Sequence, residues 1–600
     1  MDNRSIARVL RETAQLLEID GAIIGRYRSY ERAAELIDSL PDSIEQLVKE
    51  PEKLKALPGI GDRMVEHLQE IVDTGDYALR QKLLKKYPAT ILDLLQLQSL
   101  GPKKVAFLWK TFKAGTVADV ETIAKEGKLR DLAGFGEKSE QNILKAVEVF
   151  KKSSGRFHVH VAEEAALAIT THIGKHGKGV ASVTPAGSLR RGKETVGDLD
   201  LLVTLANGHT SQKQVDALAK HILKYPGIDQ TLAHGENKVS FTLQDGLQVD
   251  VRMLEKDNFG AALLYFTGSK EHNVTLRGRA NDLGFTLNEY VLATLKGEKH
   301  VAGRTEEEIY AKLKLDYIPP ELRENTGEIA AAENHKLPNL ITLKDVKGDL
   351  QMHTPASDGK NTIEEMAEAA RKLGHQYIAI TDHSKAVTVA NGLDEKRMAA
   401  HIKALYAADK KDLGIRVFAG SEVDILKDGS LDYSDEILAQ LVVVVCSIHS
   451  YFNLDRAAMT ERMLAAIENP YTQIIGHPTG RVLLRRDPLD YDMEKVLDAC
   501  AKHGVAMECN SYPDRLDLKD VYLRMCKERG VKVVISTDSH NASNLSLIHY
   551  GVTMARRGWL EKKDVINTLP TEQFLAALRP KPGAVKPASA HPSRKAAGRR

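Results

Sequence analysis

Two aspartates, Asp198 and Asp200, stand two residues apart in a short apolar stretch, VGDLDLLV (196–203). Alternate residues of a β-strand point to the same face, so a strand here places both carboxylates side by side, while Leu199 and Leu201 enter a core. Two carboxylates held this close repel each other, and the usual reason to tolerate the repulsion is a divalent metal ion. The pattern predicts a metal site. The competing interpretation is an exposed strand with two solvated aspartates.

The residues before this strand suit a bound anion. A Gly-Ser turn (187–188) is followed by Arg190 and Arg191, and such a turn offers backbone N–H groups and cations of the kind that bind a triphosphate. Further along, residues 238–254 predict a hairpin whose second strand carries Asp250. A third carboxylate beside the first two completes a site for two Mg²⁺ or Mn²⁺ ions, which nucleotidyl transfer requires.

Residues 1 to about 150 are predicted to be almost entirely helical, because apolar residues recur there at helical spacing. One pattern occurs three times: a Gly-containing turn precedes a helix at 57–61, 100–104 and 132–138. This is the form of a helix-hairpin-helix, in which the first N–H groups of a helix bind a DNA phosphate and nearby lysines add charge. Three copies favour sequence-independent DNA-backbone binding over ordinary helix–helix turns. The candidate residues are Gly59, Gly61, Gly101, Lys103, Lys104, Gly134, Gly136 and Lys138.

Three motifs together carry a family resemblance. GSLRRGKETVGDLD (187–200), VDVR (249–252) and YFTGS (265–269), followed by Asn273 and Arg277, resemble the family X DNA polymerases, the group of DNA polymerase beta. The resemblance runs from the N-terminus to about residue 320, and it implies that the three aspartates are the catalytic metal ligands. It implies an all-α DNA-binding domain (1–85), a fingers-type helical domain (86–154), an α+β nucleotidyltransferase palm (155–257) and a thumb-type domain (258–320).

The same resemblance implies roles for single residues. Tyr265, Phe266 and Gly268 would lie along the sugar of the incoming nucleotide and help to exclude ribonucleotides. Asn273 and Arg277 are four residues apart, hence on one helical face, and that face would meet the nascent base pair and the template. The full set implied to bind the nucleotide is Gly187, Ser188, Arg191, Gly197, Tyr265, Phe266, Gly268, Asn273 and Arg277.

The N-terminal domain departs from the family at one position. Its relatives often carry a deoxyribose-phosphate lyase lysine on the helix after the first hairpin, which forms a Schiff base with an abasic sugar. His67 stands at that position here. Because histidine cannot form the same imine, we expect DNA binding from this domain but little or no lyase activity.

From about residue 341 to 575, apolar runs of strand length alternate with amphipathic helices, which predicts a seven-stranded α/β barrel after a linker at 321–340. Nearly every strand is followed by a residue type that binds metals, and active sites in such barrels lie at the C-terminal ends of the strands. Imidazoles mixed with carboxylates suit zinc, manganese or iron rather than magnesium alone. The residues are His353, Asp358, Asp382, His383, Glu422, His449, His477, Asp538 and His540.

This set resembles the PHP (polymerase and histidinol phosphatase) domain, a trinuclear-metal phosphoesterase. The fusion resembles the bacterial PolX enzymes, in which this domain is associated with manganese-dependent 3′–5′ exonuclease and 3′-end processing. The family's His-x-His opening reads Gln351-Met352-His353 here, and a glutamine carbonyl is a weak, neutral ligand. We expect a Mn²⁺/Zn²⁺ cluster of two or three ions and a nuclease that persists but is weakened. The alternative is a PHP domain that serves only as a scaffold.

Composition sets broader limits. The 84 basic and 82 acidic residues nearly balance, so any DNA-binding surface must be local. Four cysteines without a CxxC pair, and the lack of a signal sequence or membrane-length apolar run, predict a soluble, cytoplasmic, nucleoid-associated protein without membrane contact. The basic, Pro/Ala-rich segment 576–600 predicts a disordered tail. We expect a monomer.

The residues and the resemblance together predict a multidomain, template-directed DNA polymerase that uses dNTPs to fill short gaps in gapped or primed DNA during repair. A PHP-domain 3′–5′ exonuclease would accompany it. Two alternatives stay open: a template-independent nucleotidyltransferase, and a DNA-binding scaffold whose catalytic sites have decayed. Asn273 and Arg277 favour templating, and the intact set of three aspartates opposes decay of the polymerase half.

Overall fold

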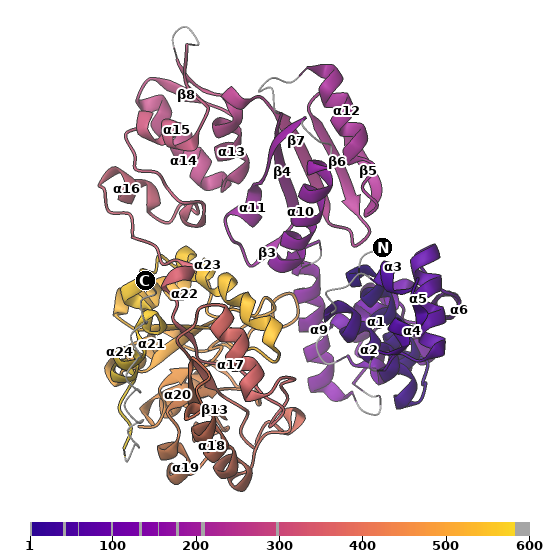
Figure 1. Cartoon of the computed structure of the whole chain (residues 1–600), viewed down its shortest axis with the longest axis vertical. Helices are drawn as coiled ribbons and strands as arrows, with labels where there is room; N and C mark the ends of the chain where they lie inside the picture. Colours follow the sequence, from indigo (N-terminus) through magenta and orange to yellow (C-terminus); the bar gives the residue numbers. More distant parts are fainter. Residues whose placement is uncertain are drawn as a thin grey trace, which may run out of the picture. The chain divides into compact units, whose positions relative to one another are not determined.

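The computed structural model describes residues 3–39, 44–57, 59–97, 100–130, 132, 135–153, 155–175, 179–205, 211–295 and 299–582 (Figure 1). The chain forms two compact units, residues 1–154 with 484–487, and residues 155–483 with 488–600. None of the described helices is long and apolar enough to cross a membrane. The four cysteines are buried and free.

The first unit is helical, as the apolar spacing predicts. Its helices share one core, in which Ile6, Leu10 and Leu68 are fully buried. The elements are α1 (Asn3–Ile19), α2 (Ile24–Ser39), α3 (Ile44–Leu47), α4 (Pro51–Lys55), α5 (Asp62–Thr74), α6 (Ala78–Lys86), the 3₁₀ helix η1 (Ala89–Gln96), α7 (Pro102–Phe112), α8 (Val117–Lys125) and α9 (Gly136–Ser153).

The second unit opens with a five-stranded sheet in the order β2-β4-β7-β6-β5. β4 and β7 pair in parallel, and the other neighbours pair antiparallel. Leu199 and Leu201 are fully buried while Asp198 is exposed and Asp200 is half-buried, so the start of β4 alternates as the sequence predicts; from Leu202 onward the strand is buried on both faces. The elements are β1 (Phe157–His158), α10 (Val159–Gly174), β2 (Val180–Pro185), α11 (Gly187–Arg190), β3 (Thr195–Val196), β4 (Asp198–Leu205), α12 (Gln212–Ile222), β5 (Ile228–His234), β6 (Lys238–Leu243) and β7 (Gln248–Leu254).

A smaller helical layer follows and includes the segment that we expected to be a linker. Residues 321–340 contain α16 (Glu328–Glu333), where the buried Glu328 lies 2.7 Å from His272 Nδ1. The segment predicted as a linker is therefore folded against the helix that carries His272, through a contact that joins residues 56 positions apart and leaves no local signal. The other elements are η2 (Lys256–Asn258), α13 (Phe259–Thr267), α14 (Lys270–Asp282), β8 (Phe285–Leu287), β9 (Leu292–Thr294), β10 (His300–Ala302), α15 (Glu306–Lys312) and η3 (Pro320–Leu322).

A buried ion-pair network ties this layer to the five-stranded sheet. Glu306 accepts hydrogen bonds from Arg190 Nη2 at 2.7 Å and from Arg323 Nη1 at 2.5 Å. Burial opposes ionisation, yet Arg190 and Arg323 lower the pKa of Glu306 from 4.5 to about 2. An acid with a lowered pKa in the folded state adds stability that is present above pH 4.5 and is lost as the pH falls toward 2.

Glu306→Gln should lower the free energy of unfolding of this unit at pH 7 by about 3–5 kcal/mol, because it leaves two guanidinium groups unpaired in the interior. Chemical denaturation of the full chain measures the loss. The exposed neighbour Glu307 supplies the control, since Glu307→Gln should change stability by less than about 0.5 kcal/mol. The difference in free energy of unfolding between wild type and Glu306→Gln should become smaller as the pH falls from 4.5 to 2. A difference that stays constant over this range would contradict the lowered pKa of Glu306.

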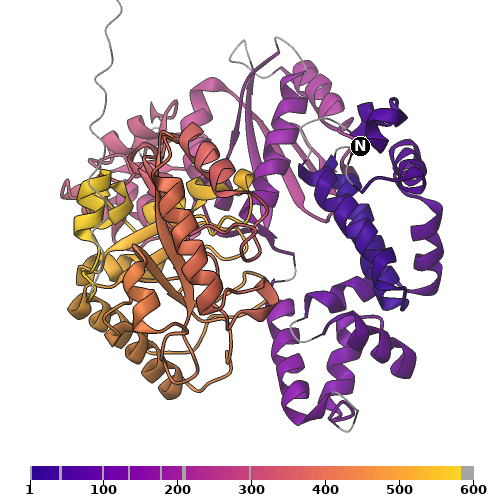
Figure 2. The same ribbon diagram turned by 60° about the horizontal axis from the view of Figure 1, so that its bottom comes forward.

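The rest of the second unit is a seven-stranded parallel barrel, as the alternating strands and helices predict. Its strands follow chain order, and an isolated parallel bridge between Met352 and Ser539 joins the segment after the first strand to the segment after the last. The helices lie around the strands (Figure 2). The strands are β11 (Gly348–Asp349), β12 (Tyr377–Ile380), β13 (Arg416–Asp424), β14 (Val443–Ser447), β15 (Ile474–Ile475), β16 (Ala506–Asn510) and β17 (Val533–Ser536). The helices are α17 (Ile363–Lys372), α18 (Glu395–Asp409), α19 (Asp435–Gln440), α20 (Arg456–Glu468), α21 (Met493–His503), α22 (Asp520–Arg529), α23 (Ile548–Arg557) and α24 (Thr571–Ala577).

The first residues of the predicted tail are held by the barrel. Arg579 Nη1 donates to the carbonyls of Ile467 at 3.0 Å and Asn469 at 2.9 Å. Lys581 Nζ donates to the carbonyl of Leu438 at 3.0 Å. The prediction of disorder is therefore wrong for residues 576–582, because their partners lie more than 100 residues earlier in the chain. Residues 583–600 lie outside the described part.

Candidate active sites

The three predicted palm aspartates meet on the five-stranded sheet. Asp200 on β4 lies directly opposite Asp250 on the parallel strand β7, and Asp198 begins β4 on the same face as Asp200. Burial, followed by the charges of Asp198 and Asp250, raises the pKa of Asp200 to about 7. A carboxyl group whose ionisation is opposed by two neighbouring carboxylates suits a divalent cation, which relieves the repulsion.

A cation already contacts this group. Lys238 Nζ lies 2.6 Å from Asp250 Oδ2, and against the effect of burial its hydrogen bond lowers the pKa of Asp250. The site therefore accepts positive charge, and its residues fit Mg²⁺ or Mn²⁺. Lys238 was not among the residues predicted from the sequence, because its partner twelve positions away is reached only through the β6–β7 pairing.

The predicted anion-binding turn borders the same carboxylates. Gly187 has a φ of +61°, and a Cβ atom there would lie 2.7 Å from Asp200 Oδ2. Only glycine permits this backbone and this approach. The turn and the three aspartates thus lie together, as the sequence predicts. Three other predicted residues belong to neighbouring segments: Ser188 within α11, Gly197 directly before β4, and Gly268 directly after α13, where a Cβ atom would lie 3.1 Å from Arg191 Nη1.

Both arginines of the turn have protein partners. Arg190 donates to Glu306 and to Thr267 Oγ1, at 2.6 Å for the latter. Arg190 therefore joins the thumb-type layer to the palm, a role that the motif did not predict. Arg191 Nε donates to Glu324 Oε1 at 3.0 Å, and its Nη1 donates to the Thr267 carbonyl at 2.5 Å. These bonds fix the orientation of the Arg191 side chain.

Three residues of the predicted nucleotide-binding set line one small pocket: Tyr265, expected along the sugar, and Asn273 and Arg277, expected at the nascent pair. Asn273 Nδ2 donates to the Tyr265 carbonyl at 2.8 Å, and Arg277 Nε donates to the Asn273 carbonyl at 3.3 Å. The Phe266 ring lies 4.2 Å from the guanidinium carbon of Arg252, two residues after Asp250 on β7. This stacking places the YFTGS segment beside the strand that carries the third aspartate.

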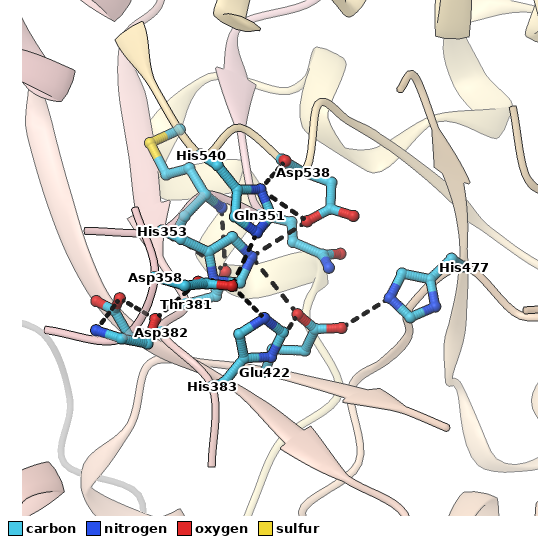
Figure 3. Close-up of polar contacts among 12 residues, drawn as sticks. Gln351, His353, Asp358, Thr381, Asp382, His383, Glu422, His477, Asp538 and His540 are labelled. Atoms are coloured by element: carbon cyan, nitrogen blue, oxygen red, sulfur yellow. Dashed lines mark hydrogen bonds and ion pairs between the residues drawn. The ribbon is translucent and has the colours of Figure 1, made fainter. Parts of the chain in front are cut away.

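A second polar cluster lies at the C-terminal ends of the barrel strands (Figure 3). It contains three overlapping groups, and within each group the ligand atoms lie within 4.8 Å of one another. His477 joins the cluster through its Nε2 atom, 2.8 Å from Glu422 Oε1. Overlapping groups of this kind suit a cluster of ions that share ligands. The groups are His353, Asp358, His383 and His540; His383, Glu422 and His449; and His353, Glu422 and Asp538.

Glu422 is the carboxylate at the centre of the barrel cluster and belongs to two of its three groups. It is fully buried and lies 3.2 Å from His449 Nε2 and 3.3 Å from His383 Nδ1. Although burial opposes it, the charges of His383 and His449 hold the pKa of Glu422 well below its usual range. An ionised carboxylate among imidazoles is a donor set for Mn²⁺ or Zn²⁺.

Two further aspartates support this cluster. Asp424 Oδ1 lies 3.0 Å from His449 Nδ1, and a carboxylate on the far nitrogen of a ligating histidine fixes its orientation. Asp424 was not among the residues predicted from the sequence, although strand alternation from Glu422 could have indicated it. Asp382, which follows β12, belongs to none of the three groups and accepts from the Thr354 N–H at 2.9 Å. It supports the loop rather than completing a group.

Gln351 is fully buried, and its side chain points toward the cluster (Figure 3). Within the described part of the chain, neither Nε2 nor Oε1 has a hydrogen-bond partner. A buried amide without partners costs about 1–3 kcal/mol per group. A metal ion would satisfy the carbonyl oxygen, so the residue present fits the predicted role of a weak ligand.

Gln351→His should raise the metal content of the purified protein and the rate of 3′-end degradation in Mn²⁺, by roughly tenfold for one improved ligand contact. Elemental analysis and a labelled-primer assay measure the two quantities. Gln351→Leu, which has no donor atom, should lower both. If neither variant changes metal content, Gln351 is not a ligand.

A fourth group of possible metal ligands comprises His158, His160 and Asp514. His158 Nε2 lies 3.1 Å from the Leu483 carbonyl, and Nδ1 lies 3.4 Å from Asp514 Oδ1. These contacts give His158 polar partners in the barrel without an ion. The group therefore belongs to the packing of the barrel against the start of the palm.

The predicted helix-hairpin-helix turns each lead into a helix. Gly61 precedes α5, Gly101 precedes α7, and α9 begins at Gly136. Lys104 Nζ donates to Ser139 Oγ at 3.2 Å, which joins the second turn to the third. The four remaining candidates are Gly59 with a φ of +83°, Lys103 and Lys138 near the starts of their helices, and Gly134, which lies outside the described residues.

His67 belongs to an aromatic cluster in the first unit. Its Nδ1 atom lies 3.2 Å from the Tyr30 hydroxyl, and its ring centroid lies 4.7 Å from that of Tyr77. Burial lowers the pKa of His67. The side chain at the expected lyase position is thus engaged in packing.

Five family models match the chain, in the order in which the folds occur. They are the helix-hairpin-helix domain (1–77), the SAM-like helix-hairpin-helix tandem (91–148), the DNA polymerase beta palm (160–246), the DNA polymerase beta thumb (262–324) and the PHP domain (349–512). The chain is also 35% identical over 581 residues to the DNA polymerase/3′-5′ exonuclease PolX of Bacillus subtilis (strain 168), covering 96% of the chain and 100% of that relative.

The chain belongs to the bacterial family X DNA polymerases that carry a PHP domain. Two shorter relatives are named probable phosphatases. One, from Thermoanaerobacter sp. (strain X514), is 29% identical over 37% of the chain and 89% of its own length. The other, from Acetivibrio thermocellus, is 32% identical over 32% of the chain and 78% of its own length. In this PolX-type polymerase the PHP match ends at residue 512, whereas the barrel continues through β17 to Asp538 and His540.

Proposed function

We propose that this family X polymerase inserts nucleotides opposite a template in short DNA gaps, and that its PHP centre removes nucleotides from 3′ ends. One observation carries the polymerase part: Asp200 and Asp250 lie opposite each other on parallel strands, with the Gly187 turn against Asp200. The Bacillus subtilis relative, named a DNA polymerase and 3′–5′ exonuclease, supports both parts.

In the palm, Asp198, Asp200 and Asp250 would hold Mg²⁺ or Mn²⁺. When bound, the ions lower the pKa of the attacking 3′-hydroxyl and neutralise charge on the leaving oxygen. The Gly187-Ser188 turn and Arg191 receive the triphosphate. Gly197, Tyr265, Phe266 and Gly268 surround the nucleotide, while Asn273 and Arg277 contact the nascent pair.

In the barrel, the clustered ligands and Gln351 would hold two or three Mn²⁺ or Zn²⁺ ions. Such ions supply an activated water and stabilise charge at a phosphodiester. The retained group geometry favours an active nuclease over the scaffold alternative, because a decayed site has no reason to keep eight ligand side chains oriented toward one another.

The hairpins of the first unit would bind the DNA backbone beside the gap through helix N-termini and through Lys103, Lys104 and Lys138. We expect little lyase activity, because His67 replaces the lysine and is packed against Tyr30 and Tyr77. We further propose a monomer that acts at the nucleoid in the cytoplasm, without membrane contact.

Primer extension separates the template-directed function from the template-independent alternative. A one-nucleotide gapped duplex, a blunt duplex and a single-stranded primer are each incubated with one dNTP at a time. We expect efficient insertion of only the complementary nucleotide, and only in the gap. Extension of the blunt or single-stranded primer with all four dNTPs would replace this proposal by a terminal transferase.

A further inference from the structure

Helix α23 of the PHP domain packs against the palm turn that carries Arg191. Thr553 lies so close to Gly192 that a Cβ atom on the glycine would be 2.1 Å from Thr553 Cγ2. Arg557, the last residue of α23, is buried, and its Nη1 atom donates to the Arg191 carbonyl at 2.7 Å. The barrel therefore contacts the main chain of the nucleotide-binding turn directly.

A second contact reaches the Arg191 side chain. Glu324 Oε1 accepts from Arg191 Nε at 3.0 Å and from Arg557 Nη1 at 3.1 Å. Against the effect of burial, the charges of Arg557 and Arg191 lower the pKa of Glu324. Asp520 of α22 accepts from Arg557 Nη2 at 2.5 Å and so fixes the other edge of that guanidinium. Arg557 is thus held by Asp520 of the barrel, bonds directly to the Arg191 carbonyl, and shares Glu324 Oε1 with the Arg191 side chain.

We propose that Arg557 is a positioning residue for nucleotide binding: it holds the Arg191 main chain directly, and holds the Arg191 guanidinium through Glu324. The inference rests on the proposed function, in which Arg191 contacts the triphosphate. The PHP barrel then forms part of the wall of the polymerase site, whatever its own metal centre does. This role also gives selection a reason to keep the barrel when one of its ligands is Gln351.

The neighbouring residue Arg556 makes packing contacts between the barrel and the segment before it, without contacting the nucleotide-binding turn. Arg556 Nε donates to Glu321 Oε1 at 2.7 Å, and its Nη1 donates to the Ile341 carbonyl at 2.9 Å. These bonds hold α23 against the segment that connects the thumb-type layer to the barrel, and neither bond reaches the Arg191 turn. Arg556→Met is therefore a matched control for Arg557→Met.

Steady-state insertion into a one-nucleotide gap, with full-length enzymes, tests the proposal. Arg557→Met should raise the KM for the complementary dNTP by about tenfold, the effect of losing one charge-assisted hydrogen bond, with kcat within about threefold of wild type. Arg557→Lys keeps the positive charge but lacks the forked guanidinium, so its KM should lie between those of wild type and Arg557→Met. Arg556→Met should leave KM within about twofold. The 3′-end degradation rate of each sample checks that the barrel is intact.

Arg191→Met distinguishes a failure of the proposed role of Arg191 from a failure of the proposed role of Arg557. If it leaves KM unchanged, the proposed role of Arg191 fails. If it raises KM while Arg557→Met and Arg557→Lys do not, or if Arg556→Met raises KM as much as they do, the positioning role of Arg557 fails. The double variant Arg191→Met/Arg557→Met should resemble Arg191→Met alone, because residues that act through one contact are not additive. Additive effects would overturn the inference. If Arg557→Met does not fold, Arg557→Lys and Asp520→Asn, which loosens the same guanidinium, carry the comparison.

Discussion

Asp200→Asn should reduce nucleotide insertion by about 10³-fold, or roughly 4 kcal/mol of transition-state stabilisation, the scale expected for disrupting a metal site that neutralises developing charge. Asp200 is the best single target because it lies opposite Asp250, shares a face with Asp198 and touches the Gly187 turn. Single-turnover insertion into a one-nucleotide gap measures the effect. Degradation of 3′ ends by the same protein should be unchanged.

Asp200→Asn also has a readout that does not depend on catalysis. The pKa of Asp200 is raised to about 7, so ionisation of this carboxyl is harder in the folded protein than in the unfolded chain. Above pH 7 the ionised side chain therefore destabilises the metal-free fold. The asparagine variant should unfold at a higher temperature than wild type at pH 8 in EDTA, and the difference should shrink when Mn²⁺ is added to wild type.

The exposed Asp229 on β5 provides the matched control. Asp229→Asn removes the same charge from the same sheet, and we expect insertion within twofold of wild type and no change in unfolding temperature. Insertion by Asp200→Asn within tenfold of wild type would contradict the three-aspartate site. A lower unfolding temperature in EDTA would contradict the raised pKa.

Glu422→Gln should reduce 3′-end degradation by about 10²–10³-fold and leave gap insertion within about twofold of wild type. Glu422 belongs to two of the three ligand groups, and its carboxylate lies within hydrogen-bonding distance of His449 and His477. Losing its charge weakens the donor set for more than one ion at once, which is costlier than losing a peripheral ligand. Elemental analysis of the purified variant should show less bound metal than wild type.

The control for Glu422→Gln is Glu436→Gln on α19, an exposed position outside the ligand groups. Glu436→Gln should have the same metal content and the same rate of 3′-end degradation as wild type. If wild type does not degrade 3′ ends in Mn²⁺, the result would contradict an active nuclease and favour the alternative that the barrel is only a scaffold. If Glu422→Gln loses metal but degrades 3′ ends at the wild-type rate, the nuclease lies elsewhere.

Comparing Asp200→Asn with Glu422→Gln tests whether the polymerase and nuclease activities depend on each other. Asp200→Asn and Glu422→Gln should each remove one activity and spare the other, because each site has its own ligands on its own sheet. Arg557 is different, because it belongs to the barrel but contacts the palm turn. Its substitution should alter nucleotide binding without touching either set of metal ligands.

The sequence by itself determined the residues of both centres. The period-2 alternation of a strand put Asp198 and Asp200 on one face, and the predicted hairpin added Asp250. In the barrel, the rule that active sites lie at the ends of parallel strands pointed to eight of the nine ligand positions, and the family motif pointed to Gln351. The structure brings these side chains together, because strand alternation and the placement of strand ends at one edge are properties of regular backbone that the local sequence pattern encodes.

Only the tertiary structure decided which polar residues serve the sites and which serve the packing. Arg190 binds Glu306, 116 positions away, and Arg557 binds the Arg191 carbonyl, 366 positions away. Asp382 has the right type and the right place after a strand, yet it supports a loop. The segments 321–340 and 576–582 have loop-like compositions and are fixed by distant partners. Such pairings depend on how separate layers pack, and no periodicity along the chain records them.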